Sequence, residues 1–381
     1  LVLLGILAAL AAWFSPPAEF VLGGLDPGVY VNAGVALARS GSFWLPEPLL
    51  AQAGPEARAV FVTQSVGLHS VLHPGFYWDE AAWAATPQFP FLLTIWTGMA
   101  SLAAGVQGAL MVPLAIGVAA AGAGALLGGR LLGPWGGVLV AALLGFHTLQ
   151  LWHARLGLAE ELAQAMLLAG LWSGVRWLDT GRRDFGVAAG LALGTLCLVK
   201  TESAAVGLIA VVALLLAPGA GAQARTPVVL GWAASAAVAT VVYATAALPL
   251  VLDQMPSVRP MLALVLVLAV AGPARALVRR PLTQALATGW GRALGPPVGR
   301  WIATAVAVVV IAVLALLETR GGYSGRLAGA LVNGLYLSPL DGALAAAGLA
   351  AIWGFRRRLR HQWVAGVLFA AGVLYLAIYF R

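Results

Sequence analysis

Long apolar runs separated by short polar stretches dominate the pattern of hydrophobic and polar positions along the chain. Residues 106–127 and 227–252 contain no charged side chain, and residues 135–152 contain only a histidine. A helix needs about 20 apolar residues to cross the hydrocarbon core of a bilayer, so the pattern predicts an all-α polytopic membrane protein with about 11 transmembrane helices. The predicted spans lie near residues 1–18, 107–128, 134–154, 160–178, 185–199, 202–218, 227–251, 260–275, 300–317, 337–355 and 362–380.

Composition supports the same fold class. Hydrophobic residues make up 61% of the chain and charged residues only 9%, whereas soluble domains carry about 25% charged residues. No soluble core can hide so much apolar sequence. The formal net charge is +8, and the basic residues are 21 arginines and one lysine. In a membrane protein this excess indicates cytoplasmic loops rather than nucleic-acid binding.

The arginines mark one side of the predicted membrane. Alternate loops hold 14 of the 22 basic residues together with only two acids, Asp179 and Asp184. The positive-inside rule places these loops in the cytoplasm. The basic residues concerned are Arg130, Arg176, Arg182, Arg183, Arg225, Arg275, Arg279, Arg280, Arg292, Arg300, Arg356, Arg357, Arg358 and Arg360. The long first loop, residues 19–106, is rich in acids and is expected on the extracytoplasmic side.

This first loop is predicted to contain short interfacial helices. Residues 27–39 have the pattern of a helix, because Asp26 is a suitable N-cap, Pro27 occupies the first position and Gly41 ends it. Residues 89–105 are apolar enough to resemble a span. Counting them as one would put the acidic loop on the arginine-rich side. We therefore predict a helix that lies in, or dips into, the outer interface.

Ionisable residues on the predicted outer side gather at the ends of spans. They are Asp26, Asp79, Glu80, His153, Arg155, Glu160, Glu161, Lys200, Glu202, Asp253, Arg259, Glu318, Arg320 and Arg326. Charged groups at membrane depth are costly, and function is the default hypothesis for them. Carboxylates that face cations in one cavity would suit a sugar carried on a lipid phosphate. A carboxylate would take the proton of an acceptor hydroxyl, and cations would stabilise the phosphate leaving group.

Each of these residues also has a purely structural interpretation. Asp26 can serve only as a helix N-cap, and Glu160 and Glu161 can cap the span that follows them. Adjacent helical residues point about 100° apart, so at most one of the two glutamates is expected to face a shared site. Lys200, the only lysine, can form an ordinary interfacial pair with Glu202.

The histidines and tryptophans give weaker signals. His153 can be a hydrogen-bonded packing residue. His69, His73, Asp79 and Glu80 share a stretch of chain, but their spacing matches no known zinc motif. No cofactor is assigned with certainty, and a divalent metal is kept as an option. The tryptophans of the first loop, at 44, 78, 83 and 96, are interpreted as an interface belt rather than a sugar-binding platform.

Several segments resemble one family of membrane enzymes. Leu25-Asp26-Pro27-Gly28-Val29-Tyr30, followed by Ala36-Leu37-Ala38-Arg39-Ser40-Gly41, resembles the first outer loop of the GT-C superfamily. The branch it is most similar to is glycosyltransferase family 39, the protein O-mannosyltransferase and aminoarabinose transferase group. Thr86-Pro87-Gln88-Phe89-Pro90 resembles that family's proline-rich stretch, residues 128–133 its cytoplasmic turn, and residues 151–161 its second outer loop. The resemblance covers roughly residues 1–205.

The resemblance implies roles for particular residues. It implies Asp26 as the catalytic base and Glu160 or Glu161 as the second acid. It also implies that Arg155 and Lys200 contact the donor phosphate. The complete set of candidate substrate-binding residues is Tyr30, His153, Arg155, Lys200 and Glu202. Two departures are that Pro27 follows Asp26 where the family usually has Glu, and that the second acid is a glutamate where it is usually Asp.

Together, these observations predict an inverting glycosyltransferase of the inner membrane. It would transfer a sugar from a polyprenyl-phosphate donor to a lipid, glycan or protein acceptor on the extracytoplasmic side. Within one transmembrane domain over residues 1–381, residues 107–218 would complete the GT-C-like module and residues 227–380 would add further helices. Leu1 at the start, and an apolar run directly before Arg381, suggest a fragment truncated at both ends.

Two other functions remain open from the sequence. A polytopic transporter or lipid flippase would have the same composition without glycosyl transfer, although transporters place polar groups near the bilayer midplane. A non-catalytic scaffold subunit of an envelope-assembly complex would tolerate the joint loss of Asp26, Arg155 and Glu160. No nucleic-acid partner is expected.

Overall fold

The computed structural model describes residues 1–19, 26–64, 70–72, 75–79, 82–217, 225–246, 361 and 363–368. The chain divides into two compact units, Leu1–Gly272 and Pro273–Arg381. The fold described below is that of the first unit, and in the second only residues 361 and 363–368 are described. The spans predicted at 260–275, 300–317 and 337–355, and most of the one at 362–380, lie outside the described residues.

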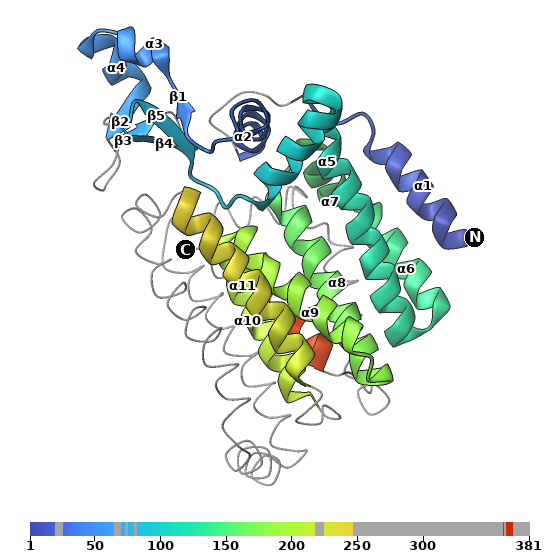
Figure 1. The fold of residues 1–381 in the computed structure, drawn as a ribbon. Coiled ribbons are helices and arrows are strands. Elements are labelled where there is room, and N and C mark those ends of the chain that lie inside the picture. The colour runs from blue at the N-terminus through green and yellow to red at the C-terminus, as the bar shows by residue number, and fades with distance from the viewer. Residues whose placement is uncertain are drawn as a thin grey trace, which may run out of the picture. The chain divides into compact units, whose positions relative to one another are not determined.

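Helices account for most of the described part of the first unit (Figure 1). Their bounds are α1 (Val2–Phe14), α2 (Asp26–Ser40), α3 (Pro48–Gln52), α4 (Pro55–Phe61), α5 (Leu92–Leu132), α6 (Pro134–Gly145), α7 (Thr148–Leu156), α8 (Ala159–Thr180), α9 (Arg183–Thr195), the 3₁₀ turn η1 (Leu196–Leu198), α10 (Thr201–Leu216) and α11 (Thr226–Ala246). Helices therefore occupy the predicted ranges from 107 to 246, and the predicted helix at 27–39 is confirmed as α2.

Two helices among the described residues are long and apolar enough to cross a membrane. They are α5 and the segment Thr226–Tyr243 of α11, and α6 with α7 would form a third span if their 64° bend is counted within one crossing. The apolar helices indicate a membrane protein. The predicted span at 134–154 is thus a broken helix rather than a straight one. The remaining helices are shorter or carry charges at their ends, so the predicted number of crossings stays a prediction.

A break divides α5 into two segments. Ala104 and Gly105 leave the helical conformation, and Gly105 has a φ of 63°, which favours glycine. The break falls where the sequence predicted an end of the helix at 89–105. The first segment packs against α2, where a Cβ on Gly34 would collide with the side chain of Thr97. Thr97 also donates a hydrogen bond to the carbonyl oxygen of Tyr30 at 3.2 Å. These contacts fix the position of α2 and hence of its first residue, Asp26.

The two ends of α8 carry different chemistry. Glu160 and Asp179 lie 19 residues apart on this helix, a rise of about 28 Å and close to the thickness of a bilayer core. At one end, Arg130 at the end of α5 donates a hydrogen bond to Asp179 at 2.7 Å. At the other end, Gly157 lies against Pro113, near the break in α5. Glu160 and the Arg130–Asp179 pair therefore lie at opposite ends of α8.

Glycines allow α5 and α6 to approach closely. A Cβ on Gly137 would lie only 2.6 Å from the carbonyl oxygen of Ala125 and 3.0 Å from the Cα of Gly129. Small residues at such crossings let helices pack in a membrane, where apolar burial alone gives little association. The same arrangement holds between α9 and α11 at Gly190 and Gly231.

We expect Gly137→Ala to destabilise the protein by about 1–3 kcal/mol, because the new methyl group overpacks the α5–α6 contact. The measurement is thermal unfolding of the purified protein in detergent. Gly5→Ala is the matched control, since a Cβ on Gly5 meets no atom within 4 Å. Equal melting temperatures of the two variants would contradict the assigned contact.

A small antiparallel sheet in the first loop corrects the all-α prediction. Its strands are β1 (Leu45–Pro46), β2 (Val62–Gln64), β3 (Ser70–Leu72), β4 (Phe76–Asp79) and β5 (Ala84–Pro87), in the order β1-β5-β4-β3-β2. Strands of two to four residues are too short to show an alternating pattern, which is why the sequence did not indicate them. Asp79 accepts a hydrogen bond from the backbone of Ala82 at 3.1 Å and so stabilises the β4–β5 turn.

Two of the tryptophans predicted to form an interface belt, Trp78 and Trp83, pack in the core of this sheet, whereas the belt stays a prediction for Trp44 and Trp96. Trp78 is 4% exposed and packs with Leu50 and Ala85. Its ring meets that of Trp83 edge-on at 5.8 Å, and the guanidinium of Arg58 lies 4.4 Å from the centre of the Trp83 ring. The loop is thus a small folded module with its own apolar centre.

We expect Trp78→Ala to destabilise this module by about 3 kcal/mol, because it removes the largest side chain of the module's core. The measurement is limited proteolysis between residues 45 and 87 in the purified protein. Val60→Ala is the control, since Val60 belongs to the same module but is 74% exposed. If both variants are cleaved at the wild-type rate, Trp78 does not hold the module together.

Candidate functional site

A lysine and a glutamate form an ion pair at the start of α8. The Nζ atom of Lys200 lies 2.5 Å from Oε1 of Glu160. Glu160 is the second residue of α8, and Lys200 directly precedes α10. Their side chains are only 11% and 23% exposed, so the attraction acts in a medium of low dielectric constant and is stronger than at a wetted surface.

The sequence indicated both residues but not their pairing. The structural interpretation of Lys200 gave it Glu202 as a partner, whereas in the structure Glu160 is a partner, 40 positions earlier in the chain. The side chain of Glu202 lies outside the described side chains, and its predicted role stays a prediction. The pair forms because η1 returns the chain to α8, an approach that no local pattern reveals.

His153 belongs to the same cluster. It lies in the last turn of α7, and its imidazole interacts electrostatically with both Glu160 and Lys200. The Gly157 turn, in the left-handed conformation with a φ of 79°, reverses the chain between α7 and α8. This reversal brings the histidine back toward the carboxylate. Three of the predicted site residues therefore come together.

Glu161 points away from this pair, as the angle between adjacent helical residues predicts. It is 2% exposed and accepts a hydrogen bond of 2.6 Å from the amide of Gln150 on α7. The same amide donates to the side-chain oxygen of Gln164 at 2.9 Å. A buried polar group needs such partners to offset its desolvation. The sequence pattern did not indicate Gln150 and Gln164; the available signal was an uncharged amide side chain among the mostly apolar residues of each predicted span.

Arg155 connects α7 to the end of α1. Its Nε donates to the carbonyl oxygen of Pro16 at 2.9 Å, and its own carbonyl oxygen accepts from the backbone of Ala18 at 3.0 Å. These bonds give the arginine a structural task between two segments 139 positions apart. Its predicted contact with a donor phosphate stays a prediction.

Asp26 and Tyr30 lie on α2. Asp26 is half-buried in the first turn of the helix, where the helix dipole favours a negative charge. Tyr30 is 1% exposed, and its ring packs on Phe89 at 5.4 Å. Tyr30 therefore contributes to the packing of α2, and a role in binding substrate would need that packing to open. The contacts described here place α2 against α5 and do not themselves join Asp26 to the cluster of Lys200.

In the part of the chain that the structure describes, no group of three or more histidine, cysteine, aspartate or glutamate side chains is arranged to hold a metal ion. His69, His73 and Glu80, considered from the sequence, lie outside that part. The cluster at Glu160 instead offers a carboxylate, an ammonium and an imidazole. That set can bind a phosphate, orient a hydroxyl and exchange a proton.

No protein-family model, curated protein or solved structure matches the chain. The resemblance to the GT-C superfamily consequently rests on the quoted sequence segments. The candidate site is defined by the chain's own contacts, above all by the partly buried pair of Glu160 on α8 and Lys200 before α10.

Proposed function

We propose that the chain is a membrane glycosyltransferase that uses a polyprenyl-phosphate-linked sugar on the extracytoplasmic side of the inner membrane. The observation that carries the proposal is the pair of Lys200 and Glu160, with His153 beside it. A charged pair held at one end of a long apolar bundle has few structural purposes there, since charge at membrane depth is costly. It is suited to a substrate whose phosphate lies at the membrane boundary and whose lipid lies within it.

The proposed reaction proceeds with inversion. An acceptor hydroxyl attacks the anomeric carbon while the bond from that carbon to the phosphate oxygen breaks. Asp26 takes the hydroxyl proton, and the polyprenyl phosphate leaves with its negative charge. The ammonium of Lys200 stabilises this charge as it develops, and Glu160 holds the ammonium in position. In this mechanism His153 would donate a hydrogen bond to the phosphate.

The separation of charges along α8 supports the proposed orientation. The carboxylate–lysine cluster lies at one end, and Arg130 with Asp179 lies at the other. If the arginine-rich end faces the cytoplasm, as the positive-inside rule requires, the cluster faces outward. That is the side on which a flipped lipid-linked sugar is presented.

The direct test is an assay of the full chain in proteoliposomes with radiolabelled polyprenyl-phosphate mannose, glucose and arabinose. The expected result is release of polyprenyl phosphate, together with transfer of label to a lipid, glycan or peptide acceptor. Product stereochemistry opposite to that of the donor would establish inversion. If none of the three donors is consumed in the presence of cell-envelope acceptors, the proposed reaction is wrong.

A transporter is the second candidate, and one observation favours it. The α6–α7 pair bends by 64°, and the buried contact of Gln150 with Glu161 lies beside that bend. Broken helices with polar groups are typical of transporter binding sites. Counterflow of polyprenyl-phosphate sugar in the same proteoliposomes, without transfer, would favour this function. Transfer without counterflow would favour the enzyme.

A further inference from the structure

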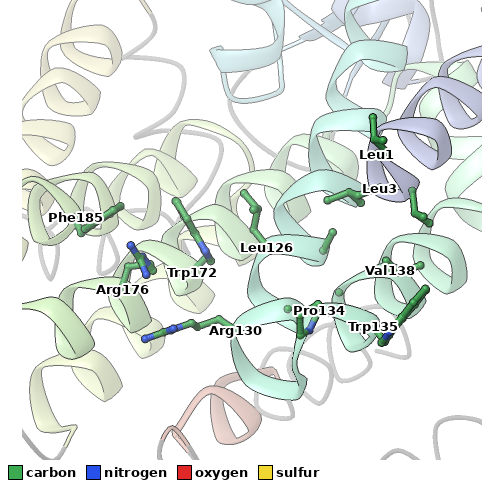
Figure 2. Close-up of a pocket in the computed structure, with 14 residues that line it drawn as sticks. Leu1, Leu3, Leu126, Arg130, Pro134, Trp135, Val138, Trp172, Arg176 and Phe185 are labelled. Atoms are coloured by element: carbon green, nitrogen blue, oxygen red, sulfur yellow. The ribbon is translucent and has the colours of Figure 1, made fainter.

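A groove opens at the arginine-rich end of the bundle, opposite the candidate site. It has a volume of about 640 Å³ and is bordered by α1, α5, α6, α8 and the start of α9. Figure 2 shows the side chains of Arg130 and Arg176 together on one side of it, with apolar side chains such as Leu126 and Val138 alongside and across from them. The groove thus has a basic part and an apolar part.

The apolar part of the groove continues into exposed apolar side chains. Trp135 is 76% exposed and Leu126 is 47% exposed, although both border the groove. In a membrane protein, apolar side chains with such exposure contact acyl chains. A tryptophan near the end of a helix is also typical of the interface between hydrocarbon and headgroups.

The basic part of the groove contains a hydrogen-bond donor without an acceptor. In the described residues, Nε of Arg176 is buried and has no hydrogen-bond partner, while its guanidinium lies 5.1 Å from the centre of the Phe185 ring. A buried donor without an acceptor costs free energy, so such a group calls for an explanation. Arg130 bonds to Asp179 through Nε and is 43% exposed. Its guanidinium therefore has further donors that a ligand in the groove can reach.

We propose that this groove binds an anionic glycerophospholipid. The phosphate would accept hydrogen bonds from Arg130 and Arg176, and an acyl chain would lie along Leu126 and Trp135. Charge complementarity selects this occupant: among the described residues around α8 and the start of α9, Arg130, Arg176, Arg182 and Arg183 outnumber Asp179 and Asp184, and basic pockets between membrane helices bind anionic headgroups. The inference depends on the membrane location of the chain and not on glycosyl transfer.

The test is native mass spectrometry of the full chain released from detergent micelles that contain either phosphatidylglycerol or phosphatidylcholine. We expect phosphatidylglycerol to remain bound and phosphatidylcholine to be lost. Arg176→Gln and Arg130→Gln should each weaken phosphatidylglycerol binding roughly five- to tenfold. Arg183→Gln is the matched control, because it removes the same charge from the same end but from a residue outside the groove.

Several results would overturn the proposal. Equal retention of the two lipids would show that the headgroup charge does not determine binding. If Arg183→Gln weakens phosphatidylglycerol binding as much as Arg176→Gln does, the effect comes from the net charge of this end of the protein and not from the groove. A lipid-free dimer that dissociates on Trp135→Ala would assign the groove to a second copy of the chain. If Arg176→Gln does not fold, Leu126→Trp fills the groove with both arginines intact. Wild-type phosphatidylglycerol binding in that variant would also contradict the assignment.

Discussion

Asp26→Asn is expected to lower glycosyl transfer by roughly a hundred- to ten-thousand-fold, the range that a general base contributes. The amide has nearly the shape of the carboxylate and can still cap α2, so the helix and its packing on α5 should persist. What is lost is the ability to accept the proton of the acceptor hydroxyl. The measurement is the turnover of radiolabelled polyprenyl-phosphate sugar in proteoliposomes, beside the melting temperature of the same preparation.

A matched control separates this chemistry from a general loss of charge. Glu56 lies in the same predicted first loop as Asp26, in the first turn of α4, and is exposed. Glu56→Gln should retain wild-type turnover. Full activity of Asp26→Asn would exclude Asp26 as the base, whereas equal inactivity of both variants would point to a nonspecific effect on the loop.

Lys200→Met is expected to have the second large effect, on activity and stability together. Transfer should fall by about 10²–10³-fold, as when one group that stabilises developing charge is removed. Loss of one partner leaves the Glu160 carboxylate in a partly buried place without its lysine. We expect this to cost roughly 2–3 kcal/mol, which is below the usual range for buried pairs because both side chains keep some exposure.

A double substitution distinguishes the two effects. In Lys200→Met with Glu160→Gln, neither side chain is charged, so thermal stability should recover most of what Lys200→Met loses, while transfer stays low. Lys200→Arg should retain both stability and part of the transfer, because it keeps a cation near Glu160. Recovery of activity in the doubly substituted protein would show that Lys200 acts only as a structural partner.

The helical part of the fold could be predicted because its signals are local. The Asp-Pro start and glycine end define α2, and apolar runs of sufficient length define α5 and α11. The break at Ala104–Gly105 also coincides with a local change, from an apolar run to glycine. By contrast, the strands β1–β5 are two to four residues long and pair through contacts made in space. Their aromatic residues gave the same signal as an interface belt.

The sequence indicated which residues form the candidate cluster but not which of them contact one another. Charge within apolar sequence identified Glu160, Lys200 and His153. Their association depends on the Gly157 turn and on the path of η1, which bring together residues 40 positions apart. The amide of Gln150 has no formal charge, so the charge pattern did not indicate it, although it donates a hydrogen bond to Glu161. The groove was not predicted either, because Arg130 and Arg176 indicated only the cytoplasmic side of the predicted membrane.

The break in α5 has a mechanical consequence. The two segments touch directly across the break, because a Cβ on Gly108 would lie 2.3 Å from the carbonyl oxygen of Ala100. The segment before the break is joined to α2 through Gly34 and Thr97, so the angle at Gly105 sets the direction of both helices relative to the rest of α5. If Asp26 is the proposed base, the same angle determines how far its carboxylate reaches from α5.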